Sequence, residues 1–369
     1  MTDIVTPNYK LILKTPSGSK IAECVSYLDL VYTKEVNAPG LCSFKLDYDY
    51  FAIPLLEDKA QVEVWRRNPE AGIAWYCDFY GLYRKKGLTY KNEQLFTATC
   101  PGIMTMLSWR HIGYKADTAN RSLYTTLPVE TIMKSLVTYN LTSAGTVADG
   151  RVRLATLTSP GTITVQLDAA GGNTVDSYAC AFRNVLTELQ KLAGVYGGGD
   201  FDLVQTAANT WQFRFYAGQL GTDRTADVTF AVEYGNMANP VYTKDRINEA
   251  SVVIVGGQGL AALRAVRIVT GPDYAVANDI ETFADGRNLA TNAGLDELGA
   301  RVANDKKARV TFDYDVIQTA SCRYGRDYFL GDLVTAVWDT ISVTQQIIGV
   351  TVTAKTDGSE VIDVKTRTQ

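Results

Sequence analysis

The sequence has little of what most catalytic sites require. His111 is the only histidine among 369 residues. A Ser-His triad would therefore depend on that one side chain, and a metal site with two histidine ligands is impossible. The neighbours Trp109, Arg110 and Ile112 instead fit a polar residue at the end of a short helix. We assign no catalytic residue, and the chain is not expected to be an enzyme.

Cysteine pairs with functional spacing are also absent. The six cysteines lie far apart, and no Cys-x-x-Cys pair occurs. Neither a zinc site nor a redox motif is supported, and no cofactor is expected. Buried free thiols that pack as small hydrophobic groups are favoured over disulfides. The cysteines are Cys24, Cys42, Cys77, Cys100, Cys180 and Cys322.

The chain also lacks long runs of one charge and long apolar runs. With 36 basic and 40 acidic residues, its net charge is −4. That balance offers no surface for gripping nucleic acid, although a protein that only lets DNA pass does not need one. No stretch approaches the roughly 20 apolar residues of a membrane-spanning helix. The N-terminus lacks the apolar core of a signal peptide, so we expect no membrane insertion and synthesis in the cytosol.

What the sequence does contain is many short segments with strand-like alternation. The 21 tyrosines beside 5 methionines favour strands over helices. The length predicts two or three domains. In the first hundred residues, strand-like segments separated by turn residues predict a barrel or a sandwich over residues 1–115. These segments are 9–14, 28–33, 42–47, 61–65, 75–83 and 93–100.

The middle of the chain carries helical spacing instead. Short helices are predicted at 103–110, from Pro128 to residue 137, and from Phe182 to residue 192, with Gly194 as the C-terminal cap. Residues 138–179 are weakly patterned and predict loops with one or two strands. Segments 201–205 and 211–216 predict a hairpin. Residues 116–225 should therefore form an α+β insert.

The last part returns to strands and predicts a second barrel over residues 226–369. A helical excursion is predicted around 289–307, because apolar residues recur there at helical spacing. They are Leu295, Leu298, Val302 and Ala303. The predicted strands are 228–232, 251–255, 263–269, 310–316, 333–338, 346–353 and 361–364.

The densest local signal is YGRDYFLGDLVTAVW at residues 324–338. Aromatic and branched residues flank Gly331 and Asp332, a pair suited to the positive φ of a tight turn or bulge. We therefore predict two half-buried strands joined by a structural turn at Gly331 and Asp332.

A second glycine motif resembles a nucleotide site. Gly257, Gly259 and Ala262 satisfy G-x-G-x-x-A after an apolar strand. A dinucleotide site needs a helix next, but only about ten residues separate this motif from Gly271 and Pro272. A structural turn between two strands is favoured, and a nucleotide-binding enzyme stays as an alternative. Arg224, in a separate turn at 221–225, is by itself weak evidence for phosphate binding.

A different alternative is a peptidoglycan hydrolase that uses paired carboxylates. Two Asp or Glu side chains suffice for that chemistry, and their spacing along the chain is hardly constrained. Because the sequence has 40 acidic residues and none stands out from its neighbours, no pair is assigned.

Three segments taken together resemble a known family. They are GQLGTDRT at 218–225, the stretch 233–259 with Tyr234-Gly235-Asn236, and residues 324–338. They are similar to tail-tip hub proteins of siphophages. The resemblance implies a phage tail hub fold shared with contractile-phage baseplate hubs: two tube-like β-barrels per chain and an inserted α+β region. It also implies a ring of three chains, whose six barrels match a hexameric tail tube.

The resemblance also implies a role, location and partners. The chain would be a structural homotrimer at the virion tail tip, assembled in the cytoplasm of the bacterial host. It would join the distal tail protein ring to receptor-binding or tip proteins and gate the channel for tape measure protein, with DNA only in transit. Some relatives continue into a receptor-binding or hydrolase region. This sequence stops at Gln369, so a bare hub is expected.

Overall fold

Most of the chain folds into β-strands, as its alternating apolar residues predict. A computed structural model of the protein describes residues 8–90, 94–113, 122–142 and 157–369. Within these residues the fold is mainly β, with its longer helices in the middle of the chain and near residue 300. The predicted mainly β class with an α+β region is confirmed.

Eight strands precede the helical part of the chain and divide between two sheets. β2, β1, β5 and β6 form a four-stranded sheet, whereas β3, β4, β8 and β7 belong to a larger one. Each predicted strand overlaps an observed one, and β2 and β7 were not predicted. Residue 93, where the last predicted strand starts, lies outside the described residues. The bounds are β1 Tyr9–Lys14, β2 Lys20–Cys24, β3 Asp29–Glu35, β4 Ala38–Asp47, β5 Gln61–Asn68, β6 Ile73–Leu82, β7 Lys85–Tyr90 and β8 Gln94–Pro101.

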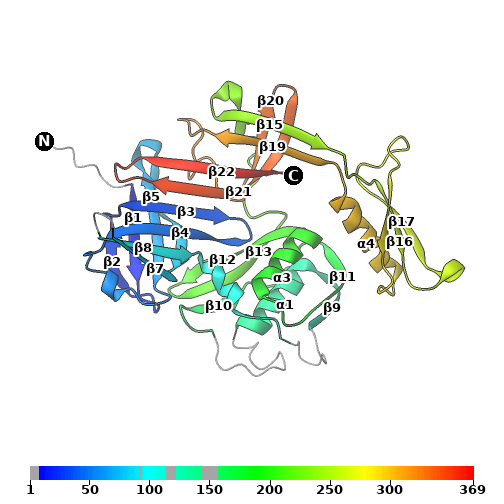
Figure 1. The fold of residues 1–369 in the computed structure, drawn as a ribbon, viewed down its shortest axis with the longest axis horizontal. Coiled ribbons are helices and arrows are strands. Elements are labelled where there is room, and N and C mark those ends of the chain that lie inside the picture. The colour runs from blue at the N-terminus through cyan, green and yellow to red at the C-terminus, as the bar shows by residue number, and fades with distance from the viewer. Residues whose placement is uncertain (1–7, 91–93, 114–121, 143–156) are drawn as a thin grey trace.

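The larger sheet joins the two ends of the chain. Its strand order is β14-β20-β21-β3-β4-β8-β7, and β22 also pairs with β21. β21 lies antiparallel to β3, with Thr351 opposite Thr33. Strands from the first and last parts of the sequence therefore lie side by side (Figure 1). The C-terminal strands are β14 Thr229–Ala231, β20 Leu333–Trp338, β21 Ile341–Ala354 and β22 Glu360–Thr368.

This shared sheet corrects the expectation of two separate closed barrels. None of the sheets formed by the described residues closes on itself. β3 bonds to β21 on one side and to β4 on the other, so the edge that would close an N-terminal barrel joins the C-terminal strands instead. The division into 1–115, 116–225 and 226–369 stays a prediction, and its boundary at residue 115 lies outside the described residues.

One apolar core contains side chains from both sheets. Alternate residues of β1 are fully buried, namely Tyr9, Leu11 and Leu13, as expected for strands with one buried face. The same core includes Phe44 of β4 and Val350 of β21. All six cysteines are free thiols, and all are buried except Cys77, which is partly exposed. The prediction of buried free thiols is therefore confirmed for five of them.

The insert forms a second core around two helices. β12 and β13 make the predicted hairpin, and β10 adds to β13 in parallel. Helices α1 and α3 bury residues such as Ile132 and Leu189 against this sheet and against β9 and β11. The bounds are β9 Ser122–Pro128, α1 Val129–Leu141, β10 Thr162–Val165, β11 Thr174–Cys180, α3 Val185–Lys191, β12 Gly199–Ala207 and β13 Thr210–Ala217. A 3-10 helix at Ile103–Trp109 precedes them.

The predicted helices differ from the observed ones mainly at their ends, and α1 extends to Leu141 rather than residue 137. α1 starts one residue after Pro128, which ends β9. Phe182 lies before α3 with a φ of 56°, and Asn184 caps that helix by accepting the Thr187 N–H. After α3 the chain continues through a π-helical turn that contains Gly194, and the positive φ of Gly197 ends it. No helix of the described residues is long and apolar enough to cross a membrane.

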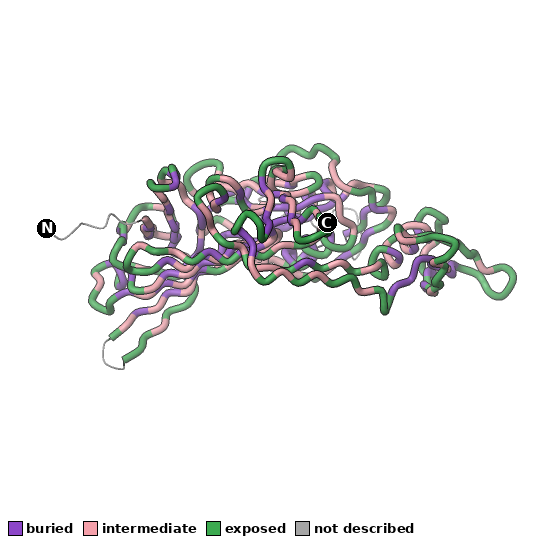
Figure 2. The backbone as a smooth tube through the Cα atoms, turned by 90° about the horizontal axis from the view of Figure 1, so that it is seen from above, coloured by how far each residue is buried: buried purple, intermediate pink, exposed green. Residues whose placement is uncertain are grey.

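A lobe of residues 246–308 projects from one end of the elongated molecule (Figures 1 and 2). It is inserted between β15 and β19, which pair with each other. Its own sheet has the order β17-β16-β18, and α4 packs on one face. α4 agrees with the predicted helical excursion, whereas β15 and β18 were not predicted. The bounds are β15 Met237–Asp245, β16 Val252–Gly256, β17 Val266–Thr270, β18 Glu281–Asp285, α4 Asn292–Asp305 and β19 Arg309–Val316.

The segment 324–338 contains one strand rather than two. β20 has the predicted bounds, but residues before Gly331 form turns and a single bridge between Tyr324 and Tyr328. Both tyrosines are fully buried in the main core. Asp327 accepts the Arg323 N–H and tightens the turn between them. With this turn between them, the two rings lie 6.0 Å apart in the core.

Candidate functional site

Gly331 and Asp332 lie where β20 meets the linker that leaves the insert. Gly331 has a φ of +92°, in the left-handed region. A Cβ atom there would lie 2.6 Å from the backbone nitrogen of Gly221 and 2.8 Å from Cβ of Leu220. Glycine is therefore required both by the backbone angle and by the close approach of the linker.

The carboxylate of Asp332 holds this linker in place. It accepts the N–H groups of Thr222 at 2.7 Å and Phe329 at 2.9 Å, and the Nε–H of Arg224 at 2.7 Å. Asp332 is only 2% exposed. A buried carboxylate with three donors is stabilised by charge-assisted bonds. Arg224 is paired with Asp332, so the structure adds nothing to the weak sign of phosphate binding that its turn offered.

A second buried carboxylate, Asp200 of β12, connects the insert to the large sheet. It accepts from the Leu220 N–H at 2.9 Å and from the side-chain amides of Asn37 at 2.7 Å and Gln346 at 2.8 Å. Asn37 belongs to the β3–β4 turn, and Gln346 to β21. Sequence reasoning missed Asp200, since a single Asp in a strand gives no sign of its distant partners.

Gly257 and Gly259 form the predicted turn between the antiparallel strands β16 and β17. A Cβ on Gly257 would lie 2.7 Å from Cδ1 of Leu295 on α4, and Gly259 has a φ of +99°. A short 3-10 turn at Ala261–Leu263 and then a strand follow, where a dinucleotide site needs a helix. This turn belongs to the lobe, whereas Gly331 lies just before β20 of the large sheet, so the two glycine turns are parts of different sheets.

A buried ion pair ties β5 to β22. Arg66 is 1% exposed and binds both oxygens of Glu360, with Nη2 to Oε1 at 2.7 Å and Nε to Oε2 at 2.9 Å. Its Nη1 also donates to the hydroxyl of Tyr76 and to the carbonyl of Tyr324, both at 3.1 Å. This bidentate geometry joins residues nearly 300 positions apart.

A second polar cluster is centred on Asp78 of β6. Its oxygens accept from the hydroxyls of Tyr32 at 2.6 Å and Tyr324 at 2.9 Å and from Lys34 Nζ at 2.7 Å. Burial opposes ionisation of Asp78, but Lys34 and Tyr32 outweigh it and hold its pKa below the ordinary value.

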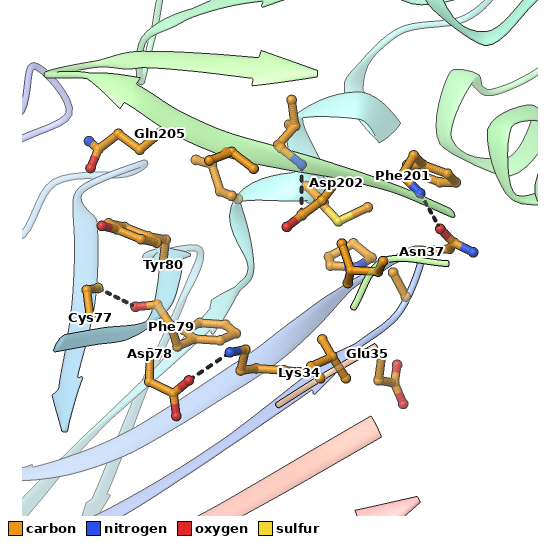
Figure 3. Close-up of a pocket in the computed structure, with 18 residues that line it drawn as sticks. Lys34, Glu35, Asn37, Cys77, Asp78, Phe79, Tyr80, Phe201, Asp202 and Gln205 are labelled. Atoms are coloured by element: carbon orange, nitrogen blue, oxygen red, sulfur yellow. Dashed lines mark hydrogen bonds and ion pairs between the residues drawn. The ribbon is translucent and has the colours of Figure 1, made fainter. Parts of the chain in front are cut away.

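A cavity of about 230 Å³ lies next to this cluster (Figure 3). β12 of the insert forms one wall, and the β3–β4 turn and β6 form the other. Asp202 projects from β12 near the Lys34–Asp78 pair, and its Oδ1 accepts the Leu203 N–H at 2.7 Å. Burial raises the pKa of Asp202 to about 6, although Lys34 acts in the opposite direction.

Two carboxylates, Asp202 and Asp78, line this cavity, so it is the place to ask whether the chain could hydrolyse a glycosidic bond. Asp202 and Asp78 have pKa values moved in opposite directions, as the acid and base of a glycosidase require. However, Asp78 is 5% exposed and both of its oxygens are occupied by Lys34 and two tyrosine hydroxyls. A carboxylate held in this way cannot reach a water or a sugar, so the pair fits a structural role better.

The structure also shows the surroundings of the single histidine and of the cysteines, to which the sequence assigned no catalytic role. His111 forms an isolated backbone bridge with Asn184 near the end of the 3-10 helix, and its side chain is exposed. Burial raises the pKa of the Cys322 thiol to about 11, which lowers its reactivity at neutral pH. Within the described part of the chain, no cluster of three or more His, Cys, Asp or Glu side chains is placed to hold a metal ion.

The whole fold is similar to solved structures of phage tail proteins. The 43 kDa tail protein of prophage MuSo2 from Shewanella oneidensis aligns with a TM-score of 0.60 and 13% identity over 97% of this chain and 98% of that one. The prophage tail protein gp18 of Listeria monocytogenes aligns at 0.57 and 12%, covering 96% and 94%. A tail protein of Neisseria meningitidis aligns at 0.53 and 11%, covering 98% and 97%.

These alignments cover nearly the full length of both chains, so they include the insert and the lobe as well as the large sheet. At such low identity they establish a shared fold. No curated protein matches the sequence. The resemblance to tail and baseplate hub proteins inferred from the sequence is confirmed. The model of one protein family matches residues 13–365, and the chain therefore belongs to the family of Siphovirus ReqiPepy6 Gp37-like proteins.

Proposed function

We propose that this chain is the structural hub at the tip of a non-contractile phage tail and acts as a homotrimer. The observation that carries the proposal is the fold, which agrees with prophage tail proteins over almost the whole chain. The role is mechanical and needs no cofactor. Buried carboxylates such as Asp200 and Asp332 support it, because they hold segments together rather than face a substrate.

In this proposal the trimer occupies the virion tail tip. It joins the distal tail protein ring to receptor-binding or tip proteins, and it gates the channel for tape measure protein. DNA passes through without being gripped, which suits a net charge of −4. Assembly takes place in the cytoplasm of the bacterial host.

The first test is the oligomeric state of the purified chain. Size-exclusion chromatography with light scattering should give three times the chain mass of 40.4 kDa. The trimer should also bind a preformed ring of the distal tail protein in sedimentation. A stable monomer that fails to bind the ring would contradict the proposal.

The same preparation separates the hub from the hydrolase that the sequence left open. Incubation with purified peptidoglycan should release no soluble fragments. Release of fragments by the wild type, and its loss in Asp202→Asn, would favour the hydrolase, since Asp202 carries the raised carboxyl pKa in the cavity.

A further inference from the structure

The cavity between the insert and the N-terminal strands carries charged side chains on opposite walls. β12 supplies Asp202 on one wall, and β3 supplies Lys34 on the other (Figure 3). Phe201 and Leu203 are buried in the core of the insert, so Asp202 between them points to the opposite side of the strand. A carboxylate is therefore presented to a cavity of about 230 Å³.

Asp202 has fewer partners than the carboxylates that hold the fold together. Asp78, Asp200 and Asp332 each accept hydrogen bonds from three donors. Among the residues that the structure describes, Asp202 accepts from the Leu203 N–H alone, at 2.7 Å. An ionised carboxylate can accept about four hydrogen bonds. Asp202 is therefore left with acceptor capacity beside the cavity.

Two cations act on Asp202 from a distance, and both are bound to other groups. Lys34 Nζ pairs with Asp78 at 2.7 Å. Arg214 lies opposite Asp202 on β13, but its Nε donates to the side-chain oxygen of Gln212 at 2.8 Å. Neither cation forms an ion pair with Asp202 in the described part of the chain. The negative charge of Asp202 therefore has no counter-charge in direct contact.

The lining as a whole suits a cation that also has an apolar part. Carboxylates outnumber ammonium groups among its charged residues, which are Lys34, Glu35, Asp78 and Asp202. Much of the remaining lining is apolar and includes Ile103, Met104 and Leu330. Binding cavities commonly combine an apolar wall with a few polar groups that fix the orientation of the ligand. This cavity would orient an ammonium group towards Asp202.

The volume of the cavity limits the ligand to a few heavy atoms. An apolar cavity of about 150 Å³ accepts benzene, and sites for drug-sized molecules have roughly 300–1,000 Å³. The cavity of about 230 Å³ lies between these sizes. Glu35, Asn37 and Gln205 in its lining are partly exposed, so a small solute can reach it from the surface.

We propose that this cavity binds a small primary amine in its ammonium form, with Asp202 as the counter-charge. The ammonium group supplies the donors that Asp202 lacks, and the carbon chain of the ligand lies against the apolar part of the lining. A bound amine contacts both walls and so stabilises the insert against the N-terminal strands. The site lies within one chain and does not depend on the trimer of the proposed function.

Binding should depend on pH in a defined direction. Burial raises the pKa of Asp202 to about 6, so this carboxyl is largely ionised at pH 7.5 and largely protonated at pH 5. Burial has the same tendency at Asp78, but Lys34 holds the pKa of Asp78 below its ordinary value, and Asp78 stays ionised. Because an ammonium group favours the ionised form of Asp202, affinity should fall by about tenfold from pH 7.5 to pH 5.

Isothermal titration calorimetry with n-butylammonium chloride, at pH 7.5 and constant ionic strength, tests the site. A dissociation constant on the order of 1 mM is expected for a ligand of this size. 1-Butanol and sodium butyrate have the same carbon chain length without the positive charge, and neither should bind.

Two variants separate the charge of the site from its space. Asp202→Asn removes the charge and keeps an acceptor for the Leu203 N–H, and it should weaken binding by about tenfold or more. Leu330→Trp fills the cavity without changing its charge and should weaken binding to a similar extent. Asp363→Asn is the matched control, because it removes an exposed carboxylate of β22 that does not line the cavity, and it should bind like the wild type.

Three results would overturn the proposal: no binding by the wild type, equal binding of 1-butanol, or unchanged affinity in Asp202→Asn. If either cavity variant fails to fold by circular dichroism, the wild type decides, and equal affinity at pH 5 and pH 7.5 overturns the site. Nα-acetyl-lysine methylamide carries the same butylammonium group on a peptide unit. Tighter binding than butylammonium assigns the site to a lysine side chain of another protein, and weaker binding assigns it to a free amine. Either result supports the site.

Discussion

At the scale of a residue, Asp202 makes stability depend on pH. Its pKa in the folded state is about 6, above the ordinary 3.8, because β12 buries it beside the cavity. Between these values the unfolded chain has lost a proton that the folded chain keeps. The free energy of unfolding therefore falls as the pH rises from about 4 to 6, by up to about 3 kcal/mol from this group.

Asp202→Asn should remove this dependence. The amide still accepts the Leu203 N–H but cannot ionise. In urea unfolding, the variant should match the wild type near pH 4 and exceed its stability at pH 7. Asp357→Asn is a control in which the change in stability should have the opposite sign. Hydrogen bonds from Ser359 lower the pKa of that exposed carboxyl, so the variant should lose stability at neutral pH. Equal pH dependence of Asp202→Asn and wild type would contradict the burial of Asp202.

At the scale of an element, the start of β20 depends on the close approach of the linker to Gly331. Gly331→Val places a branched side chain at a φ of +92° and against the Gly221 nitrogen. Backbone strain and overpacking together should lower the free energy of unfolding by about 2–5 kcal/mol. Urea unfolding measures the loss, and trimer yield should fall with it.

The matched control for this element is Gly218→Val in the same linker. Gly218 has a similar φ of +83°, but no atom lies within 4 Å of the position of an added Cβ. The Gly218→Val variant has the same backbone strain without the steric clash, so its free energy of unfolding should fall clearly less than that of Gly331→Val. Equal losses in the two variants, or a Gly331→Val protein with wild-type stability and trimer yield, would argue against the contact between the linker and β20.

At the scale of the whole molecule, the Arg66–Glu360 pair holds the two ends of the chain together. Glu360→Gln leaves a buried guanidinium without its counter-charge and should cost about 3–5 kcal/mol of stability. Asp363→Asn on the same strand is the control, since Asp363 is exposed. Chemical denaturation should show a large loss for the first variant and almost none for the second. Similar midpoints for both would show that the pair does not secure β22.

Local pattern was enough to predict many elements of this fold. β20 has the predicted bounds, and α4 and the β12–β13 hairpin agree with their apolar periods. β15 was missed because Asn239 and Pro240 interrupt it with a bulge, and Pro lacks the N–H that a strand needs. β18 was missed because its five residues, ETFAD, alternate only briefly.

The sequence by itself determined the mainly β class, the helical interruptions, the free thiols and the glycine turns, because each depends on neighbours along the chain. Only the tertiary structure decided that β21 pairs with β3 in an open sheet, that Tyr324 and Tyr328 bury as a turn, and which groups surround Asp202. Those features depend on contacts between residues hundreds of positions apart. Alternation shows which side of a strand is buried, and it carries no information about which distant strand or charge will meet it.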